Sequence, residues 1–320
     1  MNTIGRRYFM QLAGAASLSG LAASSPRPLM ASGATVTTPS SAPPPPLGAV
    51  IWVQDGESIE ASIRQIHDLG LPTCQIGFKT LTPDAAAPIK SALDKFGVVA
   101  TAFSEHGPEA FERVFNFYEG PLTIGIIPPS MRAARIRNLK LAADVAAQCG
   151  IPAVHTHCGF IPEDPNDRLY PQAVSAVREI GSYCHERGLN FLCETGQETP
   201  ITLLRLIQDT GLRNVFVNLD VANLIECGKG NPVDAITILG PLIRGTHIKD
   251  GRLPTNPREF GGTVPIGTGD VDFSRILQQL QQLAYRGPLT FETESSGAAN
   301  LQRLRDSKDF IEGLLGKIYL

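Results

Sequence analysis

Short apolar runs alternate with amphipathic stretches along this chain from residue 48 to its end. The apolar runs are typical of parallel strands buried on both faces, and they predict strands at residues 49–53, 74–78, 98–103, 153–157, 190–194, 215–220, 243–249 and 289–292. The amphipathic stretches that follow them predict helices at residues 58–69, 82–96, 131–148, 171–187, 201–208, 232–239, 273–283 and 301–315. Eight strand–helix units in this order predict that residues 48–320 form a single-domain (β/α)8 TIM barrel.

The competing architecture is an open, doubly wound sheet. Such a sheet normally carries a Gly-rich phosphate loop, GxGxxG, after its first strand. Residues 54–57 occupy that position here and read Gln-Asp-Gly-Glu, so the barrel is the better prediction. One connection, residues 105–129, is too long for a simple turn, and loops of this length in compact domains are usually functional.

Four successive predicted strands end in residues that can bind a metal ion: Glu194, Asp220, His247 and Glu292. Neighbouring strand ends share one mouth of a barrel, where active sites of this fold lie. A single acid there is often only a helix cap and a single His is often structural, but four in successive units favour a site. Three carboxylates would repel one another unless a divalent cation, Mn²⁺, Mg²⁺, Co²⁺ or Zn²⁺, binds between them. Alternation along the last strand allows Glu294 as well as Glu292.

Several motifs add a resemblance to a known family. They are VHTHCGFIP at 154–162, CETGQETP at 193–200, NLD at 218–220, GTHIKD at 245–250 and LTFE at 289–292. Together they resemble the sugar phosphate isomerase/epimerase family of xylose-isomerase-like barrels, which includes ketose 3-epimerases and inosose dehydratases. The resemblance implies that Glu194, Asp220, His247 and Glu292 bind one divalent metal ion. It also implies that Glu194 and Glu292 form the acid/base pair, and it favours Glu292 over Glu294.

Four further residues are candidates for substrate binding: His157, Glu198, Asn223 and Lys249. Glu198 resembles a substrate-binding or supporting acid, although an acid in the first turn of the next helix would also suit the helix dipole. Asn223 stands where several relatives carry a substrate-contacting His. Lys249 could hold a hydroxyl or an anion, or could be a paired structural lysine.

Three other polar residues have weaker signals. Alternation places His155 deeper in its strand than His157, which indicates a structural role. Arg132 and Arg135 could form a phosphate site, although arginines on a helix are usually solvated.

The four residues at the strand ends and the family resemblance predict a metal-dependent sugar isomerase or epimerase. It would remove a proton next to a carbonyl and pass through an enediolate. The same site could instead expel a β-substituent, as a lyase or dehydratase does. A non-catalytic carbohydrate-binding barrel would not need both Glu194 and Glu292. The apurinic-site endonucleases bind zinc through extra histidines, whereas the predicted strands two and three end without His.

Charge excludes polyanion binding. The formal net charge is −3, and residues 1–47 hold three arginines and no acid, so the predicted barrel is more acidic than the whole chain. No basic footprint for nucleic acid is present. The partner is therefore expected to be a small sugar or sugar derivative, and the sequence leaves a homo-oligomer open.

The N-terminus predicts export. Residues 5–10, Gly-Arg-Arg-Tyr-Phe-Met, form a twin-arginine pattern, and the apolar run 12–23 that follows is too short for a stable membrane span. A Ser/Pro-rich linker reaches residue 47, so the barrel would lie in the periplasm or otherwise outside the cytoplasm. Export favours a non-phosphorylated sugar, because sugar phosphates are mainly cytoplasmic. The six cysteines lack CxxC spacing and are expected to be mostly free thiols.

Overall fold

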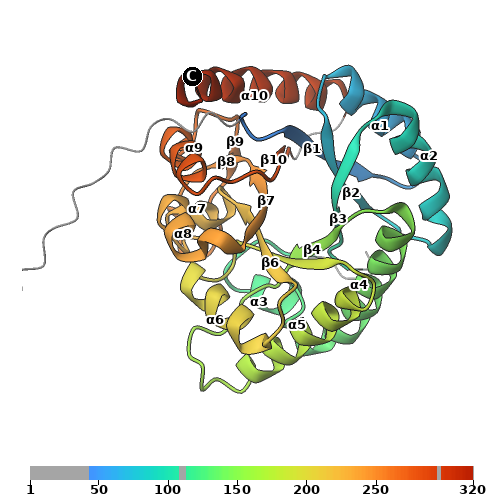
Figure 1. The fold of residues 1–320 in the computed structure, drawn as a ribbon. Coiled ribbons are helices and arrows are strands. Elements are labelled where there is room, and N and C mark those ends of the chain that lie inside the picture. Colours follow the sequence, from blue (N-terminus) through green and yellow to red (C-terminus); the bar gives the residue numbers. More distant parts are fainter. Residues whose placement is uncertain (1–42, 108–112, 294–296, 320) are drawn as a thin grey trace, which may run out of the picture. The chain divides into compact units, whose positions relative to one another are not determined.

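Eight parallel strands form a closed barrel in the order β1-β10-β7-β6-β5-β4-β3-β2 (Figure 1). The structure, a computed structural model, describes residues 43–107, 113–293 and 297–319. The predicted export signal and Glu294 lie outside these residues. The strands are β1 (Leu47–Val53), β2 (Thr73–Phe78), β3 (Val99–Ser104), β4 (Ala153–His157), β5 (Asn190–Glu194), β6 (Val215–Asp220), β7 (Ile243–Ile248) and β10 (Leu289–Phe291). The (β/α)8 prediction is confirmed.

A helix follows each barrel strand and packs outside it (Figure 1). These helices are α1 (Ile59–Asp68), α2 (Ala86–Phe96), α4 (Pro129–Cys149), α5 (Tyr170–His185), α6 (Pro200–Thr210), α8 (Pro232–Leu239), α9 (Phe273–Gln282) and α10 (Gly297–Ile318). The sequence pattern missed the short helices α3 (Gly120–Thr123) and α7 (Asn223–Glu226), and the small hairpin of β8 (Asp250–Gly251) and β9 (Thr263–Val264). It also made two strands slightly too long, so that Lys249 and Glu292 each lie one residue beyond a strand.

The core between strands and helices follows from the apolar pattern. In α1, Ser58 caps the first turn by accepting a hydrogen bond from the backbone N–H of Ala61, and Ile59, Ile63 and Ile66 form the buried face. The strands are buried on both faces, so their apolar side chains pack either against the helices or inside the barrel.

Arg132 and Arg135 lie on α4, and their side chains bind backbone carbonyl oxygens instead of being solvated as expected. Arg135 is 1% exposed and donates hydrogen bonds to the carbonyl oxygens of Gly125 and Thr123. Arg132 donates to the carbonyl of Ile126 at 2.9 Å and to that of Ile127. Both guanidinium groups therefore hold the backbone of the loop before α4, because carbonyls there have no strand or helix partner.

The loops after β3 and β7 meet above the barrel mouth. Asn116 forms an antiparallel bridge with Glu259, and the backbone N–H of Phe117 donates to the carbonyl of Arg258 at 3.1 Å. The rings of Phe117 and Phe260 pack edge to face, with centroids 4.9 Å apart. The long segment predicted to be functional therefore forms one wall of the mouth.

None of the helices in the described part of the chain has the length and hydrophobicity needed to span a membrane.

We predict that Gly125→Ala destabilises the barrel much more than Gly150→Ala. Both glycines have positive φ, 75° and 72°, which alone costs an alanine about 1–2 kcal/mol. A Cβ at Gly125 would also lie 2.1 Å from the carbonyl oxygen of Cys158, whereas a Cβ at Gly150 meets nothing within 4 Å. The free energy of unfolding, measured in urea, should fall by at least about 3 kcal/mol for Gly125→Ala. Equal losses in the two variants would contradict this close packing.

Candidate metal and active site

Strand register brings the predicted metal ligands together at the carboxyl end of the barrel. Asp220 on β6 pairs with His247 on β7, and His157 on β4 pairs with Glu194 on β5. Glu292 follows β10, whose Thr290 pairs with His247. The residues are far apart in the sequence, and parallel pairing of neighbouring strands is what makes them neighbours.

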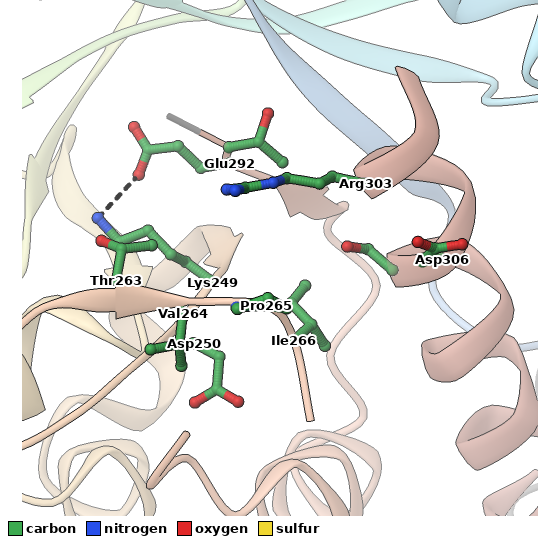
Figure 2. Close-up of a pocket in the computed structure, with 11 residues that line it drawn as sticks. Lys249, Asp250, Thr263, Val264, Pro265, Ile266, Glu292, Arg303 and Asp306 are labelled. Carbon is green, nitrogen blue, oxygen red and sulfur yellow. Dashed lines mark ion pairs between the residues drawn. The ribbon is translucent and has the colours of Figure 1, made fainter. Parts of the chain in front are cut away.

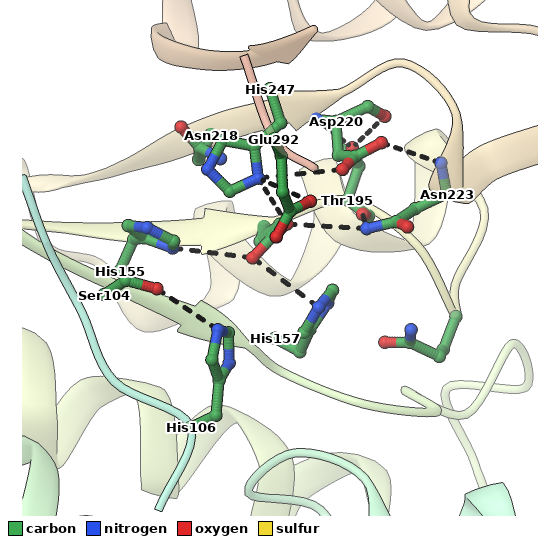
Figure 3. Close-up of polar contacts among 12 residues, drawn as sticks. Ser104, His106, His155, His157, Thr195, Asn218, Asp220, Asn223, His247 and Glu292 are labelled. Atoms are coloured by element: carbon green, nitrogen blue, oxygen red, sulfur yellow. Dashed lines mark hydrogen bonds and ion pairs between the residues drawn. The ribbon is translucent and has the colours of Figure 1, made fainter. Parts of the chain in front are cut away.

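His247 lies next to the other three predicted ligands (Figure 3). Its Nδ1 atom is 2.8 Å from Glu194 Oε1, 3.4 Å from Glu292 Oε2 and 3.6 Å from Asp220 Oδ2. One ligand atom from each of the four residues lies within 4.8 Å of all the others. We call Glu194, Asp220, His247 and Glu292 the quartet.

The donor atoms of the quartet fit a divalent cation. Asp220 Oδ1 accepts hydrogen bonds from the backbone N–H groups of Ala222 and Asn223, at 2.8 and 2.7 Å. Within the described residues, Asp220 Oδ2 and Glu194 Oε2 are buried without a hydrogen-bond partner. Leaving buried carboxylate oxygens unsatisfied is costly, and a cation among three carboxylates and an imidazole would satisfy them.

Electrostatics within the quartet favours anionic Glu194 and Glu292 beside a protonated imidazole, whereas burial raises the pKa of Asp220 above its ordinary value. Burial opposes ionisation of Glu194, but His157 and His247 hold its pKa well below the ordinary value. Burial likewise opposes the charge on His247, yet Glu194 and Glu292 raise its pKa well above the ordinary value. A metal ion would replace this proton, since a metal-binding imidazole must be deprotonated.

Lys249 balances the acids on the other side of the site. Its Nζ donates a hydrogen bond to Asn223 Oδ1 at 2.8 Å and lies 3.8 Å from Asp220 Oδ2. It also forms a 3.5 Å ion pair with Glu292 beside a small cavity of about 60 Å³ (Figure 2). Burial opposes ionisation of Glu292, but the charges of Lys249 and His247 lower its pKa below the ordinary value. Glu292 is therefore ionised at neutral pH.

A pocket of about 400 Å³ opens over the quartet. Of the predicted substrate-binding residues, His157, Asn223 and Lys249 line it, and so does Glu292. Glu194, with a side chain 1% exposed, lies beneath this wall. The aromatic residues Trp52, Phe115 and Phe260 form much of the remaining lining.

Glu198 lies away from the pocket surface. It is 1% exposed, and its neighbour Gln197 lines the pocket instead. It also precedes Thr199, the N-cap of α6, so it is not in the first turn of that helix. Burial raises the pKa of Glu198 to about 8, and the backbone N–H groups of Glu198 and Gly196 offset only part of that effect.

Sequence reasoning missed His106. It lies two residues beyond β3, which itself ends without His as predicted, so it is the following loop that brings this histidine to the site. His106, His157 and Glu194 form a second group whose ligand atoms lie within 4.8 Å of one another (Figure 3). His155, expected to be structural, is fully buried and its Nδ1 lies 3.5 Å from Glu194 Oε2.

Gln75 and Glu226 were also missed. Gln75 is a fully buried amide in the otherwise apolar strand β2, and that contrast could have marked it. Glu226 lines the pocket and its Oε2 lies 3.8 Å from Lys249 Nζ. Its position on the short helix α7 could not be read from the sequence pattern.

Fold and site together define a class of protein: a (β/α)8 barrel whose mouth gathers three carboxylates and a histidine suited to a divalent cation. Residues 63–314 match the family described as Xylose isomerase-like TIM barrel, and the chain belongs to this family.

Individual relatives agree with this assignment. An L-ribulose 3-epimerase from Methylomonas sp. (strain DH-1) is 27% identical over 183 residues, which cover 52% of this chain and 59% of that enzyme. The match therefore spans less than two thirds of this relative. The solved Xylose isomerase domain protein from Planctomyces limnophilus has a TM-score of 0.78 and 28% identity, over 86% of this chain and 99% of that one.

A Xylose isomerase-like TIM barrel protein from Mycobacterium smegmatis, solved in complex with magnesium, has a TM-score of 0.63. It is 18% identical, over 86% of this chain and 98% of that one, and shows the shared fold alone.

We predict that Glu198→Gln stabilises the protein at pH 8 but not at pH 5. The pKa of Glu198 is raised to about 8 in the folded chain from an ordinary 4.5. Between these values the unfolded chain releases a proton that the folded chain keeps, so stability falls as pH rises through this window. Glutamine removes that penalty. The melting temperature of the variant should exceed that of the wild type at pH 8, by about 2–4 °C for each kcal/mol gained.

The exposed Glu186→Gln serves as the control and should show no such pH-dependent difference. A Glu198→Gln variant with the same stability offset at both pH values would refute the prediction.

Proposed function

We propose that this protein is a metal-dependent sugar epimerase or isomerase that removes a proton from the carbon next to a carbonyl group. One observation carries the proposal: Glu292 belongs to the quartet, 3.4 Å from His247 Nδ1, and also lines the pocket. A single carboxylate can thus hold a cation and contact a substrate. The similarity to an L-ribulose 3-epimerase supports a ketose as substrate.

The quartet would hold one divalent cation, Mn²⁺, Mg²⁺, Co²⁺ or Zn²⁺, with the oxygen-rich ligand set favouring the harder ions. When bound, the cation would polarise the substrate carbonyl and stabilise the negative charge that develops as the proton leaves.

Glu292 is our candidate for the general base. Its low pKa keeps it ionised, and its side chain, 16% exposed, is the most accessible of the quartet. His157 and Asn223 on the pocket wall can orient substrate hydroxyls, and the Lys249 ammonium can donate to a substrate oxygen. Inversion of a carbon needs a second group to return a proton on the opposite face, and we assign Glu194 to this role, approaching from beneath the wall.

The predicted export favours a non-phosphorylated sugar over a sugar phosphate. The two arginines considered for a phosphate site, Arg132 and Arg135, are engaged with backbone carbonyls of the loop before α4. The proposed substrate is therefore a free ketose or keto-sugar. In the alternative reaction the same proton abstraction would lead to loss of a β-substituent.

The test is incubation of metal-loaded protein with L-ribulose, D-fructose and other keto-sugars in deuterated water. Deuterium should enter the carbon next to the carbonyl. Glu292→Gln should slow this exchange at least 10²–10⁴-fold, the usual cost of losing a general base. Glu312→Gln, an exposed acid on α10, should exchange at the wild-type rate.

The products separate the two candidate reactions. An epimer or isomer that carries deuterium supports the proposal, and an unsaturated or dehydrated product indicates the lyase. Turnover without solvent exchange, or exchange that does not depend on Glu292, would rule out the proposed mechanism.

We further propose that the barrel acts outside the cytoplasm, after export of a folded precursor by the twin-arginine route. The support is the Arg6-Arg7 pair and the apolar run at 12–23. Replacement of both arginines by lysine should leave full-length precursor inside the cell, as measured by fractionation and immunoblotting. Undiminished export of the double variant would refute the twin-arginine assignment.

A further inference from the structure

A chain of buried amides crosses the barrel interior beneath the quartet. Gln75 on β2 and Asn218 on β6 are both fully buried. Gln75 Nε2 donates a hydrogen bond to Asn218 Oδ1 at 3.2 Å, and Gln75 Oε1 lies 2.8 Å from His247 Nε2. Burying two amides inside a barrel costs free energy unless they form hydrogen bonds there.

This chain can determine which nitrogen of His247 carries the proton. If Gln75 Nε2 donates to Asn218, then Gln75 Oε1 faces His247 and accepts from its Nε2–H. The lone pair of neutral His247 then lies on Nδ1, the atom 2.8–3.6 Å from the quartet carboxylates. Metal-binding histidines depend on such a partner for tautomer and ring orientation.

The backbone around the amides leaves room for this arrangement. A Cβ on Gly245 would lie 2.4 Å from Asn218 Oδ1 and 3.5 Å from Gln75 Nε2, so a side chain there would displace the Asn218 amide that Gln75 binds. The pairing of β6 with β7 also shifts register between Val217 and Asn218. Such irregularities often redirect a side chain next to an active site.

We infer that Gln75 is a positioning residue for the metal site, which holds His247 in the orientation and tautomer that present Nδ1 to a divalent cation. Asn218 acts through Gln75: it accepts a hydrogen bond from the Gln75 amide nitrogen, which leaves the Gln75 amide oxygen facing His247. The inference rests on the proposed metal-dependent function, because it assigns the support of one ligand of the quartet.

Two substitutions of Gln75 separate positioning from packing. Gln75→Met has similar volume but offers His247 no comparable acceptor. Gln75→Glu keeps an acceptor oxygen at that place. Metal-free protein titrated with Mn²⁺ should show about 10–100-fold weaker binding for Gln75→Met, the usual cost of losing such a partner. Gln75→Glu should retain an affinity within about threefold of the wild type or better.

Gln278→Met, on the exposed face of α9, is the matched control and should bind Mn²⁺ like the wild type. Thermal unfolding of the metal-free variants checks the fold. If Gln75→Met does not fold, Gly245→Ala provides a second test, because its Cβ would displace the Asn218 amide that holds Gln75 without removing either amide. It should weaken Mn²⁺ binding in the same direction.

The negative charge of Gln75→Glu needs its own control. Combining Gln75→Met with Asn218→Asp adds a carboxylate next to residue 75. It does not restore the oxygen that accepts the hydrogen bond from His247. Affinity that stays low in this double variant supports positioning, and recovery would show that charge alone is responsible.

The outcomes distinguish this inference from the proposed function. A wild-type protein that binds no Mn²⁺ would overturn the metal-dependent function itself. A wild type that binds Mn²⁺ and a folded Gln75→Met variant of equal affinity would overturn the role of Gln75 while leaving the proposed reaction intact.

Discussion

The structure depends on one constraint: two buried carboxylates and the partly exposed Glu292 surround a single imidazole at the mouth of the barrel. Each would repel the others, and among the described residues His247, His157, Lys249 and several N–H donors oppose that repulsion. Because repulsion of this kind destabilises a fold unless it is compensated, the arrangement indicates a site shaped for a cation. The unpartnered oxygens of Asp220 and Glu194 are where that compensation is incomplete among the described residues.

The barrel supplies rigidity to this strained centre. Glu194 and Asp220 end their strands and His247 is the penultimate residue of β7, so pairing with neighbouring strands sets their backbone positions. Beneath them, Gln75 reaches His247 from the other side of the barrel interior. Above them, the loops after β3 and β7 contribute aromatic side chains to the pocket wall. The predicted metal ligands therefore lie at the ends of the strands, whereas these loops shape the pocket for the substrate.

The surroundings of Arg135 and Glu198 could not be predicted from the local sequence pattern. An arginine on a helix is usually solvated, but Arg135 is buried and donates hydrogen bonds to the carbonyl oxygens of Gly125 and Thr123. The sequence allows Glu198 in the first turn of the next helix, but it precedes the N-cap Thr199 and is buried. Neither outcome follows from periodicity, because each depends on which segment covers that position after the barrel closes.

The sequence by itself determined the strand and helix order, the barrel, and the polar residues at its strand ends, although only the family resemblance favoured Glu292 over Glu294. Those features depend on hydrophobic period and on polar residues at strand ends, and both are local properties of the chain. Only the tertiary structure decided that His106 joins His157 and Glu194, that Gln75 supports His247, and that Glu292 faces the pocket while Glu194 lies below it. The physical reason is that these contacts join strands and loops across a closed barrel, so strand register and loop packing determine them.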